Sequence, residues 1–551
     1  MTTPTLRERC EKRLAGLKAM RTPRDAECAE IARLAAPART RFLTTATNQG
    51  RRKGPTVLDS HGSRAFRTLT GGMTSGLSSS SRPWFALGTY DADLMQDEDA
   101  KAWLQEVEKR MYSFLASSNF YGAVKTGYQE MGLFGTEACV MVEDERQGIV
   151  CHALTFGEYW IACGRSLMPD TLYRRVPMTV KQAVDTFGTR VSTTVRNLYD
   201  ASNYEAIVEV MHAIEPNDTR VEGRLDASGK AFRSVWWETD SSVKTTLRES
   251  GYEEQPFWAP RWDTTGSDVW GSSPGQDALP DLRELQLQSK RKGEAIDWLI
   301  RPEKVLPSTM KLRNQPGSVV YAASIDKDKV LVPYQVPYQA VAAIADDIER
   351  CKVSIDQATY ADLFNAITNM PGVQPRTVEE IASRNEEKLT QLGPVIERVN
   401  NEKLEIAIDR VFGIMSRGQM LPPAPESLHN VDLKINFVSI LTQMQRMIGI
   451  GQIERTAGFV GNLAAVFPEA VDKLDVDAMI DDYADRAGTP KKMIRSADDV
   501  KAIRDARAQA QNAEKTAAMM PAVQQGADAA RLLSEADTGG GQNLLAQMMP
   551  A

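Results

Sequence analysis

Residues 72 to 76 come nearest to a nucleophile motif. Gly72-Met73-Thr74-Ser75-Gly76 sets a serine among glycines, as at the strand-to-helix turn of many serine hydrolases. Ser75 stands one position too late for that motif, and no strand pattern precedes it. The sequence therefore predicts a loop or helix end here. A GxxxxGK[ST] phosphate loop and an HExxH metal motif do not occur in the chain.

Cysteine and histidine residues gather in a second region, at Cys139, Cys151, His152 and Cys163. Thiolates and imidazoles are the usual protein ligands of zinc. Cys151 and His152 are adjacent in a predicted strand, so their side chains should point to opposite faces. No CxxC pair supplies chelate spacing. We therefore expect small buried thiols rather than a metal site.

Three further histidines, His61, His212 and His429, are isolated in the sequence. A general base needs a partner within hydrogen-bond reach, and the sequence names none for them. Because no motif indicates catalysis or a cofactor, the sequence predicts a protein that is not an enzyme and that carries no cofactor.

The composition is that of a folded protein with several structural units. The chain has 551 residues, 42% of them hydrophobic and 25% charged. It contains no apolar run of about 18 residues, and its first 15 residues lack a signal-peptide core, so we expect no membrane association. Six scattered cysteines favour a reducing cytoplasm. The formal net charge of −7 argues against tight duplex binding, while loose passage of nucleic acid remains compatible with it.

The first half of the chain predicts helices followed by short strands. A polar-faced helical stretch over residues 1–45 precedes a basic loop at 46–56, and apolar spacing predicts helices within 62–82, at Asp97–Ser118 and at Phe120–Phe134. The pattern then alternates, as in strands. The predicted strands are Glu137–Glu143, Ile149–Thr155, Tyr159–Cys163, Thr171–Val176, Glu205–Ile214 and Phe232–Glu238.

The second half predicts long helices separated by loops. Leu279–Ile300 and Gln339–Phe364 flank a proline-rich excursion, and Asn365–Arg376 follows as a loop. Thr377 and Glu380 have capping-box spacing and open a helix predicted to reach Ser416. Gly393-Pro394 should kink this helix, because proline removes a backbone hydrogen bond. A last helix is predicted from Ala497 to about Met520. The fold class is thus mainly α with a smaller α+β region.

Five groups of segments, in order along nearly the whole chain, resemble the portal, or head-to-tail connector, proteins of short-tailed bacteriophages. They are Leu58–Ser60 with Thr70–Leu77 and Arg82–Leu87; Ser117–Tyr121 with Phe134–Thr136 and Val142–Asp144; Arg261-Trp262 with Trp270–Gly275 and Ala278–Asp281; Thr377–Ile381 with Leu392–Pro394 and Arg410–Phe412; and Pro490–Arg507. Val269-Trp270-Gly271 departs from the family pattern, which often has a second glycine-tyrosine pair there.

The resemblance implies an elongated subunit in a ring of twelve at one capsid vertex. Its parts would be a wing (1–276 and 377–480), stem helices (277–300 and 339–364), a clip (301–338), a channel loop (365–376), a helical crown (481–537) and a flexible tail (538–551). The family has no enzymatic residues to transfer. Residues that could face the channel are Lys290, Arg291, Lys292, Asn369 and Met370. The basic run at 290–292 is either a solvated helix face or a positive ring around DNA.

The implied function is a conduit for genome packaging and ejection. The ring would nucleate capsid assembly with capsid and scaffolding proteins, dock a terminase, and later bind tail adaptor proteins. It would reside in the virion, and in the host cytoplasm during assembly. An acidic ring would repel phosphate and let double-stranded DNA slide without sequence specificity. Two alternatives remain: another structural virion protein, such as a tail adaptor or scaffold, and a phage hydrolase.

Overall fold

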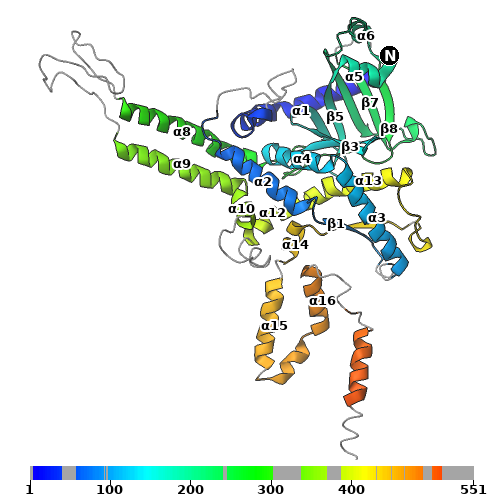
Figure 1. The fold of residues 1–551 in the computed structure, drawn as a ribbon, viewed down its shortest axis with the longest axis vertical. Coiled ribbons are helices and arrows are strands. Elements are labelled where there is room, and N and C mark those ends of the chain that lie inside the picture. Colours follow the sequence, from blue (N-terminus) through cyan, green and yellow to red (C-terminus); the bar gives the residue numbers. More distant parts are fainter. Residues whose placement is uncertain are drawn as a thin grey trace, which may run out of the picture. The chain divides into compact units, whose positions relative to one another are not determined.

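The computed structural model forms two compact units, Met1–Ile448 and Gly449–Ala551, shown in Figure 1. The structure describes residues 4–39, 57–91, 94, 97–239, 245–301, 337–368, 386–429, 431–447, 450–464, 466–487, 495 and 499–511. Among these residues, no helix is both long and apolar enough to cross a membrane.

A five-stranded antiparallel sheet forms one end of the first unit. Its strand order is β4 (Tyr159–Cys163), β5 (Pro169–Thr179), β6 (Ile207–Pro216), β7 (Phe232–Glu238) and β8 (Arg248–Tyr252). Side chains alternate across β6 because successive residues point to opposite faces. Met211 packs with α1 (Leu6–Ala35), while Val210 packs with α5 (Val180–Phe187) and α6 (Thr193–Asp200). The sheet is therefore covered by helices on both faces.

Helix α1 joins this sheet to the main core. Thr5 caps the N-terminus of this helix. Its hydroxyl accepts from the backbone N–H of Glu8, and its own N–H donates to the Glu8 carboxylate, as expected for the capping pattern S/T-x-x-E. Its first half contributes Cys10 and Leu14 to the sheet cluster, and its second half contributes Ile31 to the main core. The guanidinium of Arg21 donates to the carbonyl of Tyr159 at 2.7 Å, which ties the middle of the helix to β4.

The main core is built on a three-stranded sheet and two helices. The predicted strands Glu137–Glu143 and Ile149–Thr155 are confirmed as β2 (Ala138–Asp144) and β3 (Gly148–Leu154). A third strand that was not predicted, β9 (Phe257–Trp258), pairs with β2. Helices α3 (Glu98–Ser117) and α4 (Phe120–Phe134) pack nearby. Gly135, in the left-handed conformation at φ 79°, ends α4 in close contact with the backbone of Gly271.

A two-stranded antiparallel sheet joins distant parts of the chain. Strand β1 (Phe85–Thr89) pairs with β10 (Leu433–Phe437), so that Phe85 lies opposite Phe437. Neither strand was predicted from the sequence, because each is only five residues long.

Helices α8 and α9 lie side by side and extend from the body of the first unit (Figure 1). α8 (Leu279–Ile300) has the predicted bounds and follows the short α7 (Pro274–Asp277). The predicted helix 339–364 is in fact two: α9 (Tyr338–Ala358) and α10 (Ala361–Thr368). Tyr360 separates them with a φ of 54°, a conformation that ends a helix.

The first four residues of the predicted loop 365–376 are helical, because α10 continues to Thr368, and residues 369–376 lie outside the described part of the chain. Residues 302–336, nearly all of the predicted clip, also lie outside them.

The long helix in the second half is confirmed over residues 386–417, with one change of geometry. α12 (Glu386–Val399) continues through Pro394, a π-helical turn spans Asn400–Leu404, and α13 (Glu405–Arg417) follows. The backbone hydrogen bonds of this helix thus depart from α-helical geometry at Asn400, six residues beyond Pro394. The kink at Gly393-Pro394 stays a prediction.

The remaining helices are shorter. α2 (His61–Leu77), the predicted helix after residue 60, and α14 (Ile440–Met447) belong to the first unit. The second unit contains α15 (Ile450–Ala464), a 3-10 segment (Pro468–Lys473), α16 (Val476–Ala487) and a helical stretch at 499–511. Arg504 in that stretch pairs with Asp477 of α16 at 2.5 Å. The residues from 512 onward, including the predicted end of the last helix and the tail, lie outside the described part.

Candidate functional site

The outer half of the α8–α9 pair carries the basic cluster named from the sequence. Lys290 makes a distant ion pair with Glu294 one turn along α8, at 3.8 Å, and both side chains are largely exposed. Arg291 is exposed and Lys292 half-buried, and within the described residues neither has an ion-pair partner. The cluster therefore offers cationic groups that a polyanion could reach.

Large apolar side chains are exposed on the same outer half. Ile300 at the end of α8 is 68% exposed and Tyr338 at the start of α9 is 72% exposed, and Trp298 is also exposed. The inner half is different: Leu282 and Leu285 of α8 and Ile355 of α9 are fully buried in the main core. The α8–α9 pair is thus anchored in the main core at one end and exposes large apolar side chains at the other.

Side-chain contacts fasten the inner half to α2. The Nε2 atom of His61 lies 2.9 Å from a carboxylate oxygen of Asp356 on α9. The side chain of Gln286 on α8 accepts from the backbone of Leu58 at 2.8 Å and donates to the carbonyl of Asp59 at 2.7 Å. His61 therefore has a partner that the sequence could not name, and its contact joins α2 to the stem.

The glycines of the nucleophile-like stretch allow α2 to pack closely against two other helices. A Cβ atom on Gly72 would lie 2.1 Å from the ring of Phe364, and one on Gly76 would lie 2.7 Å from Leu441. Glycine is required because α2 approaches α10 and α14 this closely. Ser75 lies within α2 and is exposed, with its hydroxyl bonded to the carbonyl of Gly72.

A buried ion pair joins the π-helical turn to Glu137, the residue immediately before β2. The ammonium of Lys403 lies 2.8 Å from the Glu137 carboxylate and 3.6 Å from the ring centre of Tyr128. The indole of Trp258 donates to the same carboxylate at 3.0 Å. Burial raises the pKa of Glu137 and lowers that of Lys403, and each charge opposes the shift of the other.

The adjacent residue on the same turn makes a second buried pair. Arg261 donates from Nε and Nη2 to the two carboxylate oxygens of Glu402, at 3.1 and 2.6 Å. Its other donors reach the carbonyls of Leu167 at 2.7 Å and Asp268 at 3.1 Å. The wider π turn brings consecutive residues, Glu402, Lys403 and Leu404, into the interior. One turn therefore fastens the long helix to two different segments.

α13 contributes a third, more exposed network. Arg410 bonds Glu254 at 2.5 Å and Glu143 at 3.1 Å, and Arg417 bonds the same two carboxylates. These three networks join the long helix to β2, to the residue before it, and to the segments on either side of β9.

The histidine and cysteine residues do not assemble a catalytic or metal constellation among the described residues. His212 is fully buried; its Nδ1 accepts from Arg174 at 3.0 Å and its Nε2 lies 2.9 Å from the Ser234 hydroxyl. The six cysteines are free thiols, and burial raises the pKa of Cys139 well above its usual value. No group of three metal-ligating side chains occurs within the part of the chain that the structure describes. His429 is exposed.

The comparisons assign the class. The family described as "Bacteriophage head to tail connecting protein" matches residues 7–494, so the chain belongs to this family. A "Portal protein" of Salmonella phage epsilon15 is 38% identical over 539 residues, covering 97% of this chain and 96% of the relative. A "Probable portal protein" of Bordetella phage BPP-1 is 38% identical over 518 residues, covering 92% of each.

A chain from the "Neck of empty GTA particle computed with C6 symmetry" is also similar, at 11% identity, with a TM-score of 0.35, covering 73% of this chain and 86% of that one. A likeness of that size carries no functional argument.

The resemblance stated from the sequence is confirmed by these full-length relatives. The function class follows: the chain is a structural head-to-tail connector of the portal type, a part of the phage particle. The predicted fold class, mainly α with a smaller α+β region, is confirmed by the described elements.

Proposed function

We propose that twelve copies of this chain form a ring at one capsid vertex, and that double-stranded viral DNA passes through the ring during packaging and ejection. The observation that carries the proposal is the 38% identity to a portal protein over nearly the full length of both chains. The ring would contact capsid and scaffolding proteins, dock a terminase during packaging, and then bind tail adaptor proteins. Assembly would take place in the host cytoplasm.

The exposed apolar side chains support an assembled state. Trp298, Ile300 and Tyr338 are uncovered on the stem, and Phe459 and Phe467 are uncovered in the second unit. Large apolar groups that are exposed in one copy commonly mark surfaces that pack in an assembly. Contacts between neighbouring subunits would remove this apolar surface from water.

The parts of the subunit are proposed as the resemblance implies: wing 1–276 and 377–480, stem 277–300 and 339–364, clip 301–338, channel loop 365–376, crown 481–537 and tail 538–551. The described stem now divides at Tyr360, so the second stem helix would end at Ala358. Lys290, Arg291 and Lys292 would face the DNA, together with Asn369 and Met370, which lie outside the described residues.

Electron microscopy of the purified full-length chain tests the ring. We expect closed particles of about twelve subunits with an open central channel. Particles without a channel, or monomers at all protein concentrations, would contradict the proposal and favour a tail adaptor or scaffold. Substitution of Ile300 and Tyr338 by Asp should weaken assembly, whereas substitution of the exposed Tyr204 by Asp serves as a matched control away from the stem.

A further inference from the structure

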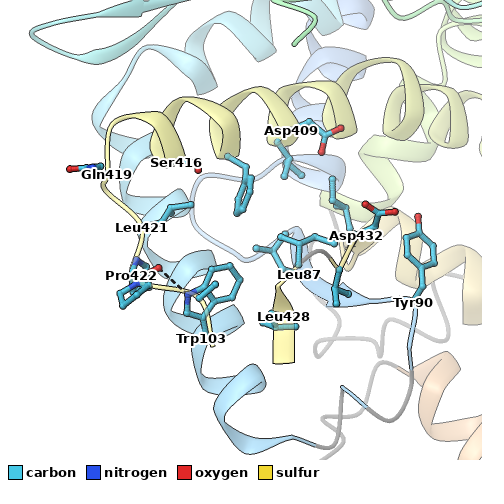
Figure 2. Close-up of a pocket in the computed structure, with 17 residues that line it drawn as sticks. Leu87, Tyr90, Trp103, Asp409, Ser416, Gln419, Leu421, Pro422, Leu428 and Asp432 are labelled. Carbon is cyan, nitrogen blue, oxygen red and sulfur yellow. Dashed lines mark hydrogen bonds between the residues drawn. The ribbon is translucent and has the colours of Figure 1, made fainter. Parts of the chain in front are cut away.

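A groove opens between α13, α3 and the two-stranded sheet, as Figure 2 shows. Its volume is about 980 Å³. Phe412 and Ile408 of α13 form one wall, and Leu87 and Ile435 of the paired strands form another. Trp103 of α3 closes one end, where its indole donates to the carbonyl of Pro422 at 3.1 Å. The groove is thus mainly apolar and large enough for several side chains.

Among the residues that the structure describes, the β10 edge of this small sheet has no hydrogen-bonded neighbour, whereas the β1 edge is closed. On β1, the outward N–H of Leu87 donates to Glu108 at 2.6 Å and that of Phe85 donates to Tyr112 at 2.8 Å. The N–H of Val438 donates to the carbonyl of Trp84, which fixes the alternation of hydrogen-bonded pairs along the two strands. The backbone N–H groups of β10 that point away from β1 are therefore those of Leu433, Ile435 and Phe437. Their N–H groups have no hydrogen-bond partner among the described residues. Such an edge is a template for an added strand.

Two carboxylates lie on the groove without a cationic partner. Asp409 of α13 and Asp432, just before β10, line it, and no ion pair joins either to a described residue. Burial, together with the nearby charges of Glu405 and Glu254, raises the pKa of Asp409 to about 6. Lys434 of β10 lies over the ring of Tyr90, 5.6 Å from its centre, and is not part of the groove lining. A cationic occupant would therefore neutralise two acidic groups that have no ion-pair partner among the described residues.

We propose that this groove binds residues 40–56 of a neighbouring copy of the chain, added as a strand along the open edge of β10. The proposal rests on the ring proposed above. The segment reads TRFLTTATNQGRRKGPT, and it contains four basic residues and no acidic one. Its first eight residues are rich in threonine and include Phe42 and Leu43, a composition that favours strands and offers apolar side chains to the groove.

The flanking residues show where the segment starts and ends. Arg39 bonds Gln129 of α4 at 2.8 Å and also pairs with Glu130, while Leu58 and Asp59 are held by Gln286. Both ends therefore belong to the first unit. Seventeen residues extended at about 3.4 Å each span at most about 58 Å, so an excursion out and back can reach about 29 Å from the body. A groove on a neighbouring copy that lies within this distance of Arg39 and Leu58 can therefore be reached.

Cross-linking between differently tagged copies tests the proposal on the full chain. One copy carries Thr45→Cys and the other Lys434→Cys, both assembled into rings and treated with a short bifunctional maleimide. We expect a covalent product joining the two tags, and none when Lys434→Cys is replaced by Glu145→Cys in the exposed β2–β3 turn. Rings that give no product between tags would overturn the proposal. A chain that carries both cysteines and cross-links only to itself would overturn it as well, by showing that the segment fills its own groove.

A second measurement does not depend on assembly. A fluorescent peptide of residues 40–56 is titrated against a full-length chain whose own residues 41–55 are replaced by Gly and Ser. We expect saturable binding, weakened at least tenfold by Asp409→Lys with Asp432→Lys and unchanged by Glu145→Lys. Equal affinity for the charge-reversed groove would overturn the proposal. Failure to form rings in the microscope, with peptide binding intact, would instead count against the dodecamer.

Discussion

The ammonium of Lys403 lies 2.8 Å from the carboxylate of Glu137, and neither side chain is more than 1% exposed. Removing one partner leaves the other charge buried without compensation. We expect Lys403→Ala to lower the free energy of unfolding by about 3–5 kcal/mol. Replacing both, as Glu137→Gln with Lys403→Met, should cost far less, because the Gln side chain still accepts from Trp258.

Urea unfolding of the single and double variants checks this. Lys290→Ala, which breaks the exposed pair with Glu294, is the matched control and should cost at most about 1 kcal/mol. A double variant as unstable as Lys403→Ala would contradict the account.

Arg261 should not tolerate lysine. Its planar guanidinium contacts both oxygens of Glu402 and two backbone carbonyls, a pattern that a single ammonium cannot reproduce. We expect Arg261→Lys to destabilise the chain by about 2 kcal/mol or more, from the loss of charged hydrogen bonds. Arg283→Lys, at the exposed pair with Glu30, should be nearly neutral in the same thermal unfolding assay. Equal melting temperatures for the two variants would refute the bidentate role.

His212 should make the chain sensitive to acid. Burial, with the nearby Arg174 charge, holds the pKa of His212 well below its usual value, because the arginine already donates to Nδ1. In the unfolded chain the imidazole of His212 takes up a proton near pH 6.5. The free energy of unfolding should therefore fall as the pH drops below about 6.5, and the contribution of His212 should be fully present above that pH.

We expect His212→Gln to reduce the decrease in stability at acidic pH, since the Gln side chain can accept from Arg174 and donate to Ser234 without titrating. Denaturation midpoints measured between pH 8 and pH 5 would show it. A variant whose midpoint falls as steeply as that of the unmodified chain would assign the acid loss to other groups.

Replacing Lys290, Arg291 and Lys292 by Gln should leave the ring intact and weaken its contact with DNA. Log affinity falls with log salt concentration, and each lost phosphate contact should make that negative slope shallower by about 0.9. The measurement is duplex binding to assembled rings across a salt series. The matched control replaces three exposed cations of the five-stranded sheet region, Arg165, Lys181 and Arg190, by Gln. The same salt slope in both triple variants would place the stem cations away from the DNA.

Helices with long apolar repeats were predictable from the sequence, and α8 was predicted to the residue. The misses have physical causes. Phe85 and Phe437 pair across more than three hundred residues, and five-residue strands carry too little periodicity to reveal such a partner. The break at Tyr360 depends on a backbone conformation that its own sequence does not signal.

The candidate site was less predictable than the fold. The basic cluster at 290–292 was visible because its residues are consecutive. The burial of Glu137 with Lys403 could not be predicted, since single charges in a sequence carry no sign that folding will bury them together. Asp356, the partner of His61, is likewise 295 residues away along the chain.

The two edges of the small sheet are unlike: Glu108 and Tyr112 occupy the β1 edge, while no described residue bonds the β10 edge. If a strand is added as proposed, it can be added on one side only, which gives the contact a direction from donor to acceptor. Directional contacts either close on themselves or extend without limit as filaments. The number of copies in the closed form would then follow from the angle between donor and acceptor on each chain, and tighter binding alone would leave that number unchanged.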